Sequence, residues 1–180
     1  MAEDVELLGE GRHLRLLRRR GWELVERRGV SVIAVLVAVT PSGELLLVEQ
    51  HREAAGGPVI ELPAGLAGDE PGSEGEALED AARRELVEET GWSCARLERL
   101  TSGPPSAGVS SEVVTLLRAQ GLERVGEGGG TRDERITVHR VPLAGAAQWL
   151  RDREREGRLV DPKVWAGLWF ARAPGALGAD

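Results

Sequence analysis

The chain has 180 residues, enough for one domain with a sizeable hydrophobic core. Its formal net charge of -7 argues against a general affinity for nucleic acid or for an anionic membrane surface. Cys94 is the only cysteine, which excludes an internal disulfide and predicts a reducing, cytoplasmic setting. We therefore expect a single domain over residues 1–180 that binds neither nucleic acid nor membrane.

The first third of the chain predicts strands. Residues 13–20 and 22–27 form two short strands that meet at Gly21. The apolar run from 31 to 39 is typical of a strand buried on both faces, and a tight turn separates it from a partner strand at 44–50. At ten residues or so the apolar run is too short to cross a bilayer, which takes about 20. A further short strand is predicted at 59–62.

The next segment, RELVEETGW from Arg84 to Trp92, predicts an acidic helix. Glu85, Glu88 and Glu89 stand at positions i, i+3 and i+4, so their carboxylates share one face and repel one another. A hard divalent cation such as Mg2+, with Mn2+ as a substitute, would relieve that repulsion. The apolar side of this helix is predicted to be Ala77, Leu78, Ala81, Ala82, Leu86 and Val87. A plain solvated face is the alternative, but it leaves Arg84 and the helix-ending Gly91 unexplained.

The remaining chain alternates between strands and helices. Strands are predicted at 97–101, 113–118 and 136–141, and a helix at 143–155. A last helix begins with Asp161 as N-cap and Pro162 at its first position. We expect it to bury Val164, Trp165, Leu168 and Trp169. The glycines at 126–130 predict a flexible loop, and 174–180 a loose tail.

The acidic helix, with Glu76 eight residues before Arg84, resembles the Nudix box, the metal-binding helix of hydrolases that cleave a diphosphate joined to another group. The resemblance implies an α/β/α sandwich with a mixed sheet and an N-terminal antiparallel strand pair. It implies metal binding by Glu85, Glu88, Glu89 and the Ala64 carbonyl, with Arg84 orienting the carboxylates. The sequence departs from the box at Glu70, where the family has glycine. Gly65 is the expected equivalent, with five extra residues in a surface loop at 67–75.

Three further segments are similar to the ADP-ribose pyrophosphatase group: WELVER at 22–27, VEQHR at 48–52 and ELPAGL at 61–66. That group also includes hydrolases of GDP-mannose and other nucleotide sugars. The resemblance implies that residues 1–30 form the arm of a homodimer and that Trp22 stacks on the nucleobase. It gives Arg52 a substrate contact, and we place Arg27 and Glu112 among the substrate-binding residues too. The alternatives are that Trp22 is an interface aromatic and Arg52 a surface charge.

The segment GGGTRDERI at 128–136 is similar to the mobile loop that carries the catalytic base in this group, and Glu134 holds the matching place. Asp133 and Glu134 could instead be simple polar loop residues. Ala107 stands where ADP-ribose enzymes commonly have proline, which bears on the substrate more than on the reaction.

Together these features predict a Mg2+-dependent hydrolase of a nucleoside diphosphate sugar, with ADP-ribose cleaved to AMP and ribose 5-phosphate. Hydrolysis of GDP-mannose, another nucleotide sugar or coenzyme A is one alternative. A non-catalytic Nudix domain that binds nucleotide as a regulator is the other. Such a regulator would be expected to have lost the box glutamates, and this chain keeps them.

Overall fold

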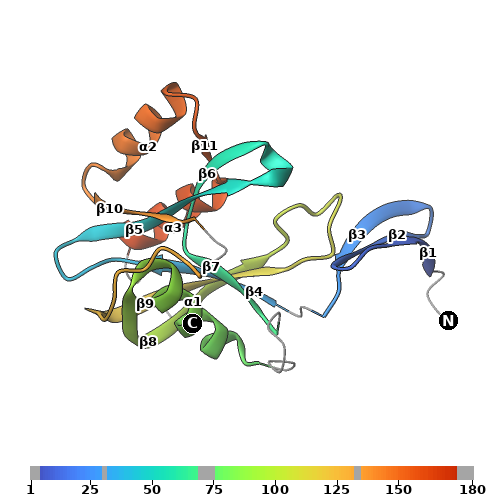
Figure 1. Ribbon diagram of the computed structural model, residues 1–180, viewed down its shortest axis with the longest axis horizontal. Helices are drawn as coiled ribbons and strands as arrows, with labels where there is room; N and C mark the ends of the chain where they lie inside the picture. Colours follow the sequence, from blue (N-terminus) through green and yellow to red (C-terminus); the bar gives the residue numbers. More distant parts are fainter. Residues whose placement is uncertain (1–4, 30–31, 69–75, 132–134, 174–180) are drawn as a thin grey trace.

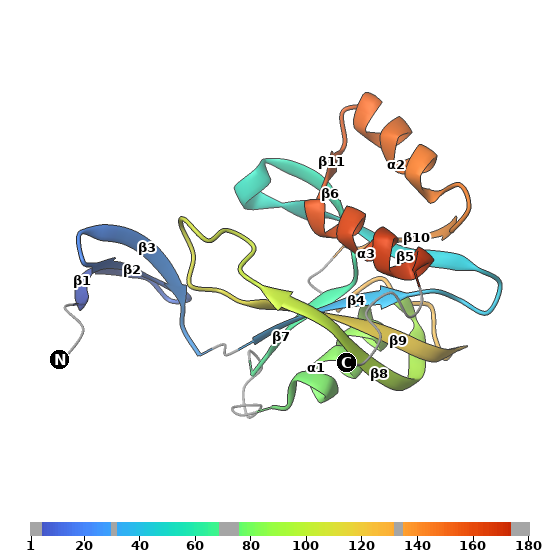
Figure 2. The same cartoon turned by 180° about the vertical axis from the view of Figure 1, so that it is seen from behind.

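The protein is described by a computed structural model that covers residues 5–29, 32–68, 76–131 and 135–173. Its first strands are β1 (Val5–Glu10), β2 (Leu14–Arg19), β3 (Trp22–Arg27), β4 (Val32–Ala38), β5 (Glu44–Arg52), β6 (Gly57–Glu61) and β7 (Ala64–Ala67). There follow α1 (Leu78–Thr90), β8 (Trp92–Gly103), β9 (Val114–Arg124), β10 (Thr137–Pro142), α2 (Ala146–Arg155), β11 (Leu159–Val160) and α3 (Pro162–Arg172). Figure 1 and Figure 2 show these elements from opposite sides.

Two four-stranded sheets form the body of the molecule. One has the strand order β7-β4-β9-β8 and the other β10-β5-β6-β11. Strand β4 runs antiparallel to β7 but parallel to β9, so the first sheet is mixed. Helix α1 packs against β4 and β7, and α3 packs against β4 from the other side (Figure 1). The predicted α/β/α sandwich with a mixed sheet is therefore confirmed.

The N-terminal strands stand away from the body as a separate antiparallel sheet (Figures 1 and 2). We call residues 5–27 the N-terminal arm. It has three strands rather than the predicted pair, because β1 adds to the edge of β2. Strand β1 was not predicted, because Leu8 breaks the alternation of apolar and polar residues in VELLGE. A bulge shifts the register of β1 between Leu7 and Gly9.

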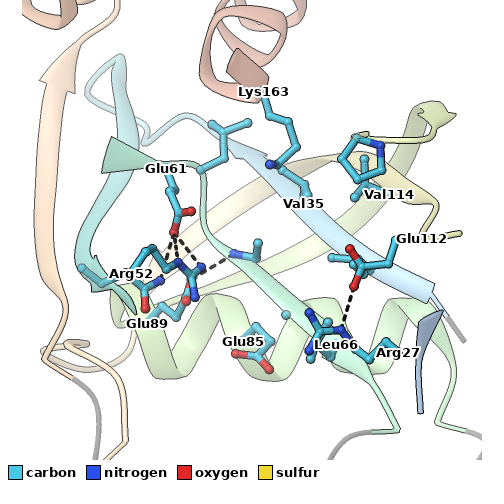
Figure 3. A pocket seen from close by; sticks show the side chains of 16 residues that line it. Arg27, Val35, Arg52, Glu61, Leu66, Glu85, Glu89, Glu112, Val114 and Lys163 are labelled. Atoms are coloured by element: carbon cyan, nitrogen blue, oxygen red, sulfur yellow. Dashed lines mark hydrogen bonds and ion pairs between the residues drawn. The ribbon is translucent and has the colours of Figure 1, made fainter. Parts of the chain in front are cut away.

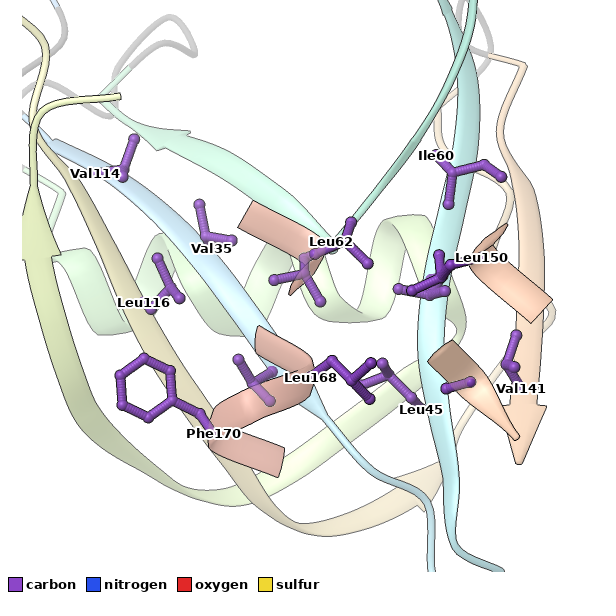
Figure 4. Close-up of a cluster of buried hydrophobic side chains, with 14 residues drawn as sticks. Val35, Leu45, Ile60, Leu62, Val114, Leu116, Val141, Leu150, Leu168 and Phe170 are labelled. Atoms are coloured by element: carbon purple, nitrogen blue, oxygen red, sulfur yellow. The ribbon is translucent and has the colours of Figure 1, made fainter. Parts of the chain in front are cut away.

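Strand β4 contributes side chains to two hydrophobic clusters. Its side chains alternate between faces, as in any strand. Val35 and Val37 belong to the larger cluster, which lies on the α3 side and is shown in Figure 4. Ala34 and Leu36 belong to a second cluster together with residues of α1. Both faces are apolar for this reason, and the continuous apolar run predicted a strand buried on both sides.

The helices differ from prediction in which residues they bury. On α1, Ala81, Ala82 and Leu86 are buried as expected, but Val87 is 38% exposed. On α3, the cap by Asp161 is confirmed, since its side chain accepts a hydrogen bond from the backbone N–H of Lys163. Trp169 was predicted to be buried and is 52% exposed, whereas the neighbouring Phe170 is buried.

Within the described ranges, no helix is long and apolar enough to cross a membrane. The predicted tail at 174–180 and most of the predicted loop at 67–75 lie outside those ranges.

Candidate active site

A pocket of about 390 Å³ opens between α1, the ends of the two sheets and the start of α3 (Figure 3). Its charged lining consists of Arg27, Arg52, Glu61, Glu85, Glu89, Glu112 and Lys163. The apolar lining includes Ile33, Val35 and Val114. Most of the residues predicted for metal or substrate binding therefore meet in one cavity, although they come from five separate segments of the chain.

The predicted acidic face of α1 is built around Arg84. Its guanidinium contacts Glu85 Oε1 at 2.8 Å, Glu76 Oε2 at 3.3 Å and Glu88 Oε2 at 3.4 Å. It also donates to the carbonyl of Leu66 on β7, which ties the helix to the sheet. The hydrogen bonds from Arg84 hold the pKa of the Glu76 carboxyl below its ordinary value. Arg84 does not line the pocket, in keeping with a role in orienting the carboxylates.

Glu89 is placed differently from the other acidic residues of α1. It is only 4% exposed, and its Oε2 accepts a hydrogen bond from the backbone N–H of Ala64 at 3.0 Å. A buried carboxylate needs such a donor, because an ionised group without partners is costly to desolvate. The bond joins the last turn of α1 to the start of β7, beside the Ala64 carbonyl that was predicted as a metal ligand.

Gly65 is required where β7 crosses α1. A Cβ at this position would overlap the side chain of Glu85. Gly65 was expected to stand in for the glycine that the family has at position 70. The structure gives that glycine a reason, since only a residue without a side chain lets the strand pass so close to the first of the clustered glutamates.

The carboxylate and carbonyl oxygens near the acidic face of α1 suit a divalent cation. Among the described residues, the carboxylates of Glu76, Glu85, Glu88 and Glu89 gather here, and Arg84 contacts the first three of them. Carboxylate and carbonyl oxygens are the ligands that hard cations prefer. In the part of the chain that the structure describes, no three acidic, histidine or cysteine side chains are already arranged around one point as metal ligands. Glu85 and Glu88 instead each direct an oxygen at Arg84.

Three of the predicted substrate residues, Arg27, Arg52 and Glu112, line the pocket, and both arginines are held in ion pairs (Figure 3). Arg27 Nε donates to Glu112 Oε1 at 2.7 Å. Arg52 contacts Glu61 Oε2 through Nε at 2.9 Å and through Nη2 at 2.6 Å. Each arginine thus faces one carboxylate that also lines the cavity.

Trp22 does not reach the pocket within this chain. It lies on the N-terminal arm, is 61% exposed, and its indole N–H donates to the carbonyl of Gly108 at 3.0 Å. The arm is joined to the loop before β9 by backbone hydrogen bonds between Val25 and both Val109 and Ser111. Arg27, at the end of the arm, is consequently the arm residue that enters the cavity.

The glycine loop after β9 is anchored on the C-terminal end of α1. The backbone N–H groups of Gly129 and Gly130 donate to the carbonyls of Glu89 and Glu88 at 2.8 and 3.0 Å. Gly129 and Gly130 are therefore bound to the helix, although the glycines at 126–130 predicted a flexible loop. Residues 132–134, including the predicted base Glu134 and Asp133, lie outside the described ranges.

Three polar or charged pocket residues had not been predicted as site residues: Gln50, Glu61 and Lys163. Gln50 and Glu61 stood inside the two quoted segments at 48–52 and 61–66, so the resemblance could have pointed to both. Gln50 Nε2 donates to the same Glu61 oxygen that Arg52 contacts. Lys163 had no such signal except that it is the only lysine in the chain.

Comparison with known proteins agrees with this geometry. The family profile of the NUDIX domain matches residues 27–162. The chain is similar to an ADP-ribose pyrophosphatase of Bacillus subtilis, with 34% identity over 159 residues that cover 88% of this chain and 80% of the relative. It is also similar to a methanol dehydrogenase activator of Bacillus methanolicus, with 29% identity over 86% of this chain and 78% of the relative.

The fold has a counterpart among solved structures. A crystal structure of an ADP compounds hydrolase superposes with a TM-score of 0.68 and covers 94% of this chain and 90% of that one. Sequence identity to it is 21%, so this likeness concerns the fold alone.

Proposed function

This chain belongs to the Nudix family and is a pyrophosphohydrolase, and on that basis we propose that its substrate is a nucleoside diphosphate sugar, with ADP-ribose preferred. Hydrolysis of ADP-ribose would give AMP and ribose 5-phosphate. The observation that carries the proposal is the single pocket in which the acidic face of α1 opposes two arginines. One side is equipped for a cation and the other for the anionic groups of a diphosphate.

We propose that Glu85, Glu88, Glu89 and the Ala64 carbonyl hold Mg2+, with Mn2+ as a substitute. A bound divalent ion neutralises charge that develops on a diphosphate and lowers the pKa of an attacking water. The chain's own contribution is to hold the ligands in place. Arg84 aligns Glu85 and Glu88, and the Ala64 N–H holds the Glu89 carboxylate against β7.

On the opposite side, we propose that Arg27 and Arg52 bind the substrate. Guanidinium groups make paired, directional hydrogen bonds to phosphate oxygens. Their present partners, Glu112 and Glu61, keep both side chains ordered at the pocket wall. Arg52 is 45% exposed in its side chain, so it can exchange part of this contact for a ligand without leaving a buried charge unpaired.

Glu134 remains the proposed general base. Glu134→Gln should lower kcat by about 100-fold or more, the usual contribution of a positioned base, and leave substrate affinity nearly unchanged. Asp133→Asn is the matched control one residue away and should have a much smaller effect. If Asp133→Asn is the more damaging change, the base is Asp133. If both are mild, Glu112 and the glutamates of α1 become the candidates.

A second copy of the chain is the proposed partner of the N-terminal arm. The arm exposes Val5, Leu7, Leu14, Leu16 and Trp22, each at 40% or more. An apolar surface of this kind on a small three-stranded sheet is typical of a subunit contact. A homodimer would also bring the Trp22 of one subunit toward the pocket of the other, where its ring can stack on a nucleobase. Sedimentation at micromolar concentration should give twice the monomer mass, and a monomer would contradict the proposal.

The experiment that tests the proposed activity is a substrate panel. ADP-ribose, GDP-mannose, UDP-glucose and coenzyme A are incubated with the protein and Mg2+, and the released phosphomonoesters are measured. We expect the highest kcat/KM for ADP-ribose. A higher value for GDP-mannose would assign the alternative substrate, and hydrolysis of none of the four would point to the nucleotide-binding regulator.

A further inference from the structure

Among the described residues, Lys163 is the one pocket cation whose counter-ion lies outside the pocket. It is the only lysine in the chain and the second residue of α3. Its side chain lines the cavity near Val35, on the wall that faces α1 (Figure 3). The side chain is 31% exposed, so the ammonium group remains accessible to a ligand.

The partner of Lys163 is fixed by the helix itself. Asp161 is the N-cap of α3, and its Oδ1 accepts the backbone N–H of Lys163 at 2.7 Å. Its second oxygen, Oδ2, contacts the Lys163 ammonium. Because the helix cap fixes the Asp161 carboxylate, the ion pair with Asp161 holds the Lys163 ammonium at the edge of the cavity. Asp161 itself does not line the cavity.

The two arginines of the pocket differ from Lys163 in where their ion-pair partners lie. Arg27 and Arg52 are each neutralised by a carboxylate that also lines the cavity, Glu112 and Glu61. An ammonium group has three N–H donors. Asp161 is the only hydrogen-bond partner of Nζ within the ranges that the structure describes. Two donors thus remain for the cavity side.

The charge balance of the cavity gives Lys163 its importance. Among the residues that the structure describes, the lining carries four carboxylates, Glu61, Glu85, Glu89 and Glu112, against the two arginines and Lys163. A substrate with two or more negative charges has to enter this cavity against a net negative lining. A compact, strongly hydrated ammonium can act there as a point charge for phosphate.

We propose that Lys163 is a substrate-binding residue that contacts a phosphate oxygen of the ligand from the α3 side of the pocket. The inference rests on the proposed hydrolysis of a nucleoside diphosphate and adds a residue to its substrate recognition. The rival role is purely structural, in which Lys163 serves only to hold the Asp161 cap.

Two substitutions separate these roles. Lys163→Met keeps most of the length of the side chain and removes the charge, whereas Asp161→Asn keeps a good cap residue and removes only the counter-ion. We expect Lys163→Met to raise KM by about tenfold or more, because it removes a charged hydrogen-bond donor to the phosphate. Asp161→Asn should leave KM unchanged or lower it, and Lys163→Arg should restore part of the affinity. If Lys163→Met and Asp161→Asn act alike on KM, the proposal is wrong.

A binding measurement without turnover gives a second, independent test. Biosynthetic incorporation of lysine labelled with 13C at Cε labels one side chain only, because Lys163 is the sole lysine, and it leaves the charge and all three N–H donors in place. In the presence of EDTA, inorganic pyrophosphate and ADP-ribose should each shift the 13Cε resonance of Lys163, and adenosine should not. This readout does not need the protein to hydrolyse any of them. A shift by pyrophosphate without hydrolysis of ADP-ribose would keep the Lys163 proposal and reject the proposed substrate. A resonance that pyrophosphate and ADP-ribose both leave in place would overturn the Lys163 proposal.

Discussion

The two walls of the pocket balance their charges in different ways. The helix wall, formed by Glu85 and Glu89 of α1 with Ala64–Leu66 of β7, gathers several carboxylates around Arg84. The opposite wall, formed by Arg27, Arg52 and Lys163 with their partners, matches each cation to one carboxylate. The helix wall has an excess of negative charge, and the opposite wall is close to neutral.

This difference indicates what each wall accepts. An excess of carboxylates on one helix face is relieved by a cation. Paired cations on the opposite wall can exchange one oxygen partner for another, so they suit an anionic ligand. The pocket can therefore bind a metal ion and a diphosphate side by side although the chain as a whole carries a net charge of -7.

The largest effect is expected from Glu89→Gln on the helix wall. Loss of an outer-sphere partner of a metal site typically costs about 10–100-fold in activity or affinity. For a proposed ligand itself we expect about 1000-fold or more in kcat, with the far-ultraviolet circular dichroism unchanged. Glu79→Gln, on an exposed position of the same helix, is the control and should be active. Full activity of the unmodified protein in excess EDTA would refute the metal requirement.

A smaller effect is expected from Gly65→Ala, which alters the helix wall without touching a charge. The new methyl group would overlap the Glu85 side chain and force it to move. We expect a loss of about 10–100-fold in kcat and weaker Mn2+ binding by electron paramagnetic resonance. Gly103→Ala is the control, because a Cβ there meets nothing within 4 Å. Equal activity of the two variants would show that the position of Glu85 is unimportant.

On the opposite wall, Arg52→Gln should mainly affect binding. It removes a charged donor but leaves the helix wall intact, so we expect KM to rise by about tenfold with a smaller change in kcat. Arg140→Gln is the matched control, since Arg140 pairs with Glu44 at 2.7 Å but does not line the pocket. A fall in kcat with no change in KM would assign Arg52 to the reaction rather than to binding.

The smallest effect on activity is expected from Gly128→Ala, at the end of α1. A Cβ on Gly128 would lie 2.7 Å from the carbonyl oxygen of Glu89, and the backbone there has a φ of +73°. We expect a loss of about 1–3 kcal/mol in stability from overpacking, seen as a lower Tm. Gly21→Ala has a similar φ of +79° but meets nothing within 4 Å, so the difference between the two variants isolates the contact. Equal Tm values would mean that the loop does not support the helix wall.

The helix wall could be predicted almost entirely from the sequence, and the opposite wall only in part. The spacing of Glu85, Glu88 and Glu89 fixes their common face as soon as the segment is helical. The pairing of Arg27 with Glu112 joins residues 85 positions apart, and no local pattern encodes it. The roles of Arg27 and Arg52 were expected only from the resemblance, and their carboxylate partners were not foreseen.

Two wrong predictions show the limit of local sequence patterns. Trp169 and Phe170 are adjacent, and hydrophobicity favours burying either one. The structure buries Phe170 in the larger core and leaves Trp169 half exposed, and α3 makes its sheet contacts with β4 and β6. The glycines at 126–130 predicted flexibility, but Gly129 and Gly130 donate hydrogen bonds to the carbonyls of Glu89 and Glu88.

The sequence by itself determined the acidic helix, its end at Gly91, the cap at Asp161 and the turn between β4 and β5, because each depends on residues close together in the chain. The predicted pairing of the strand at 31–39 with the strand at 44–50 was wrong, since β4 and β5 belong to different sheets and share only the isolated bridge between Val39 and Leu45. Only the tertiary structure decided that Gly65 must pass beside Glu85 and that Lys163 lines the pocket while its counter-ion, Asp161, lies outside it. These features depend on where separate elements end and cross. That is a property of packing over the whole domain, and it cannot be read from the periodicity of one segment.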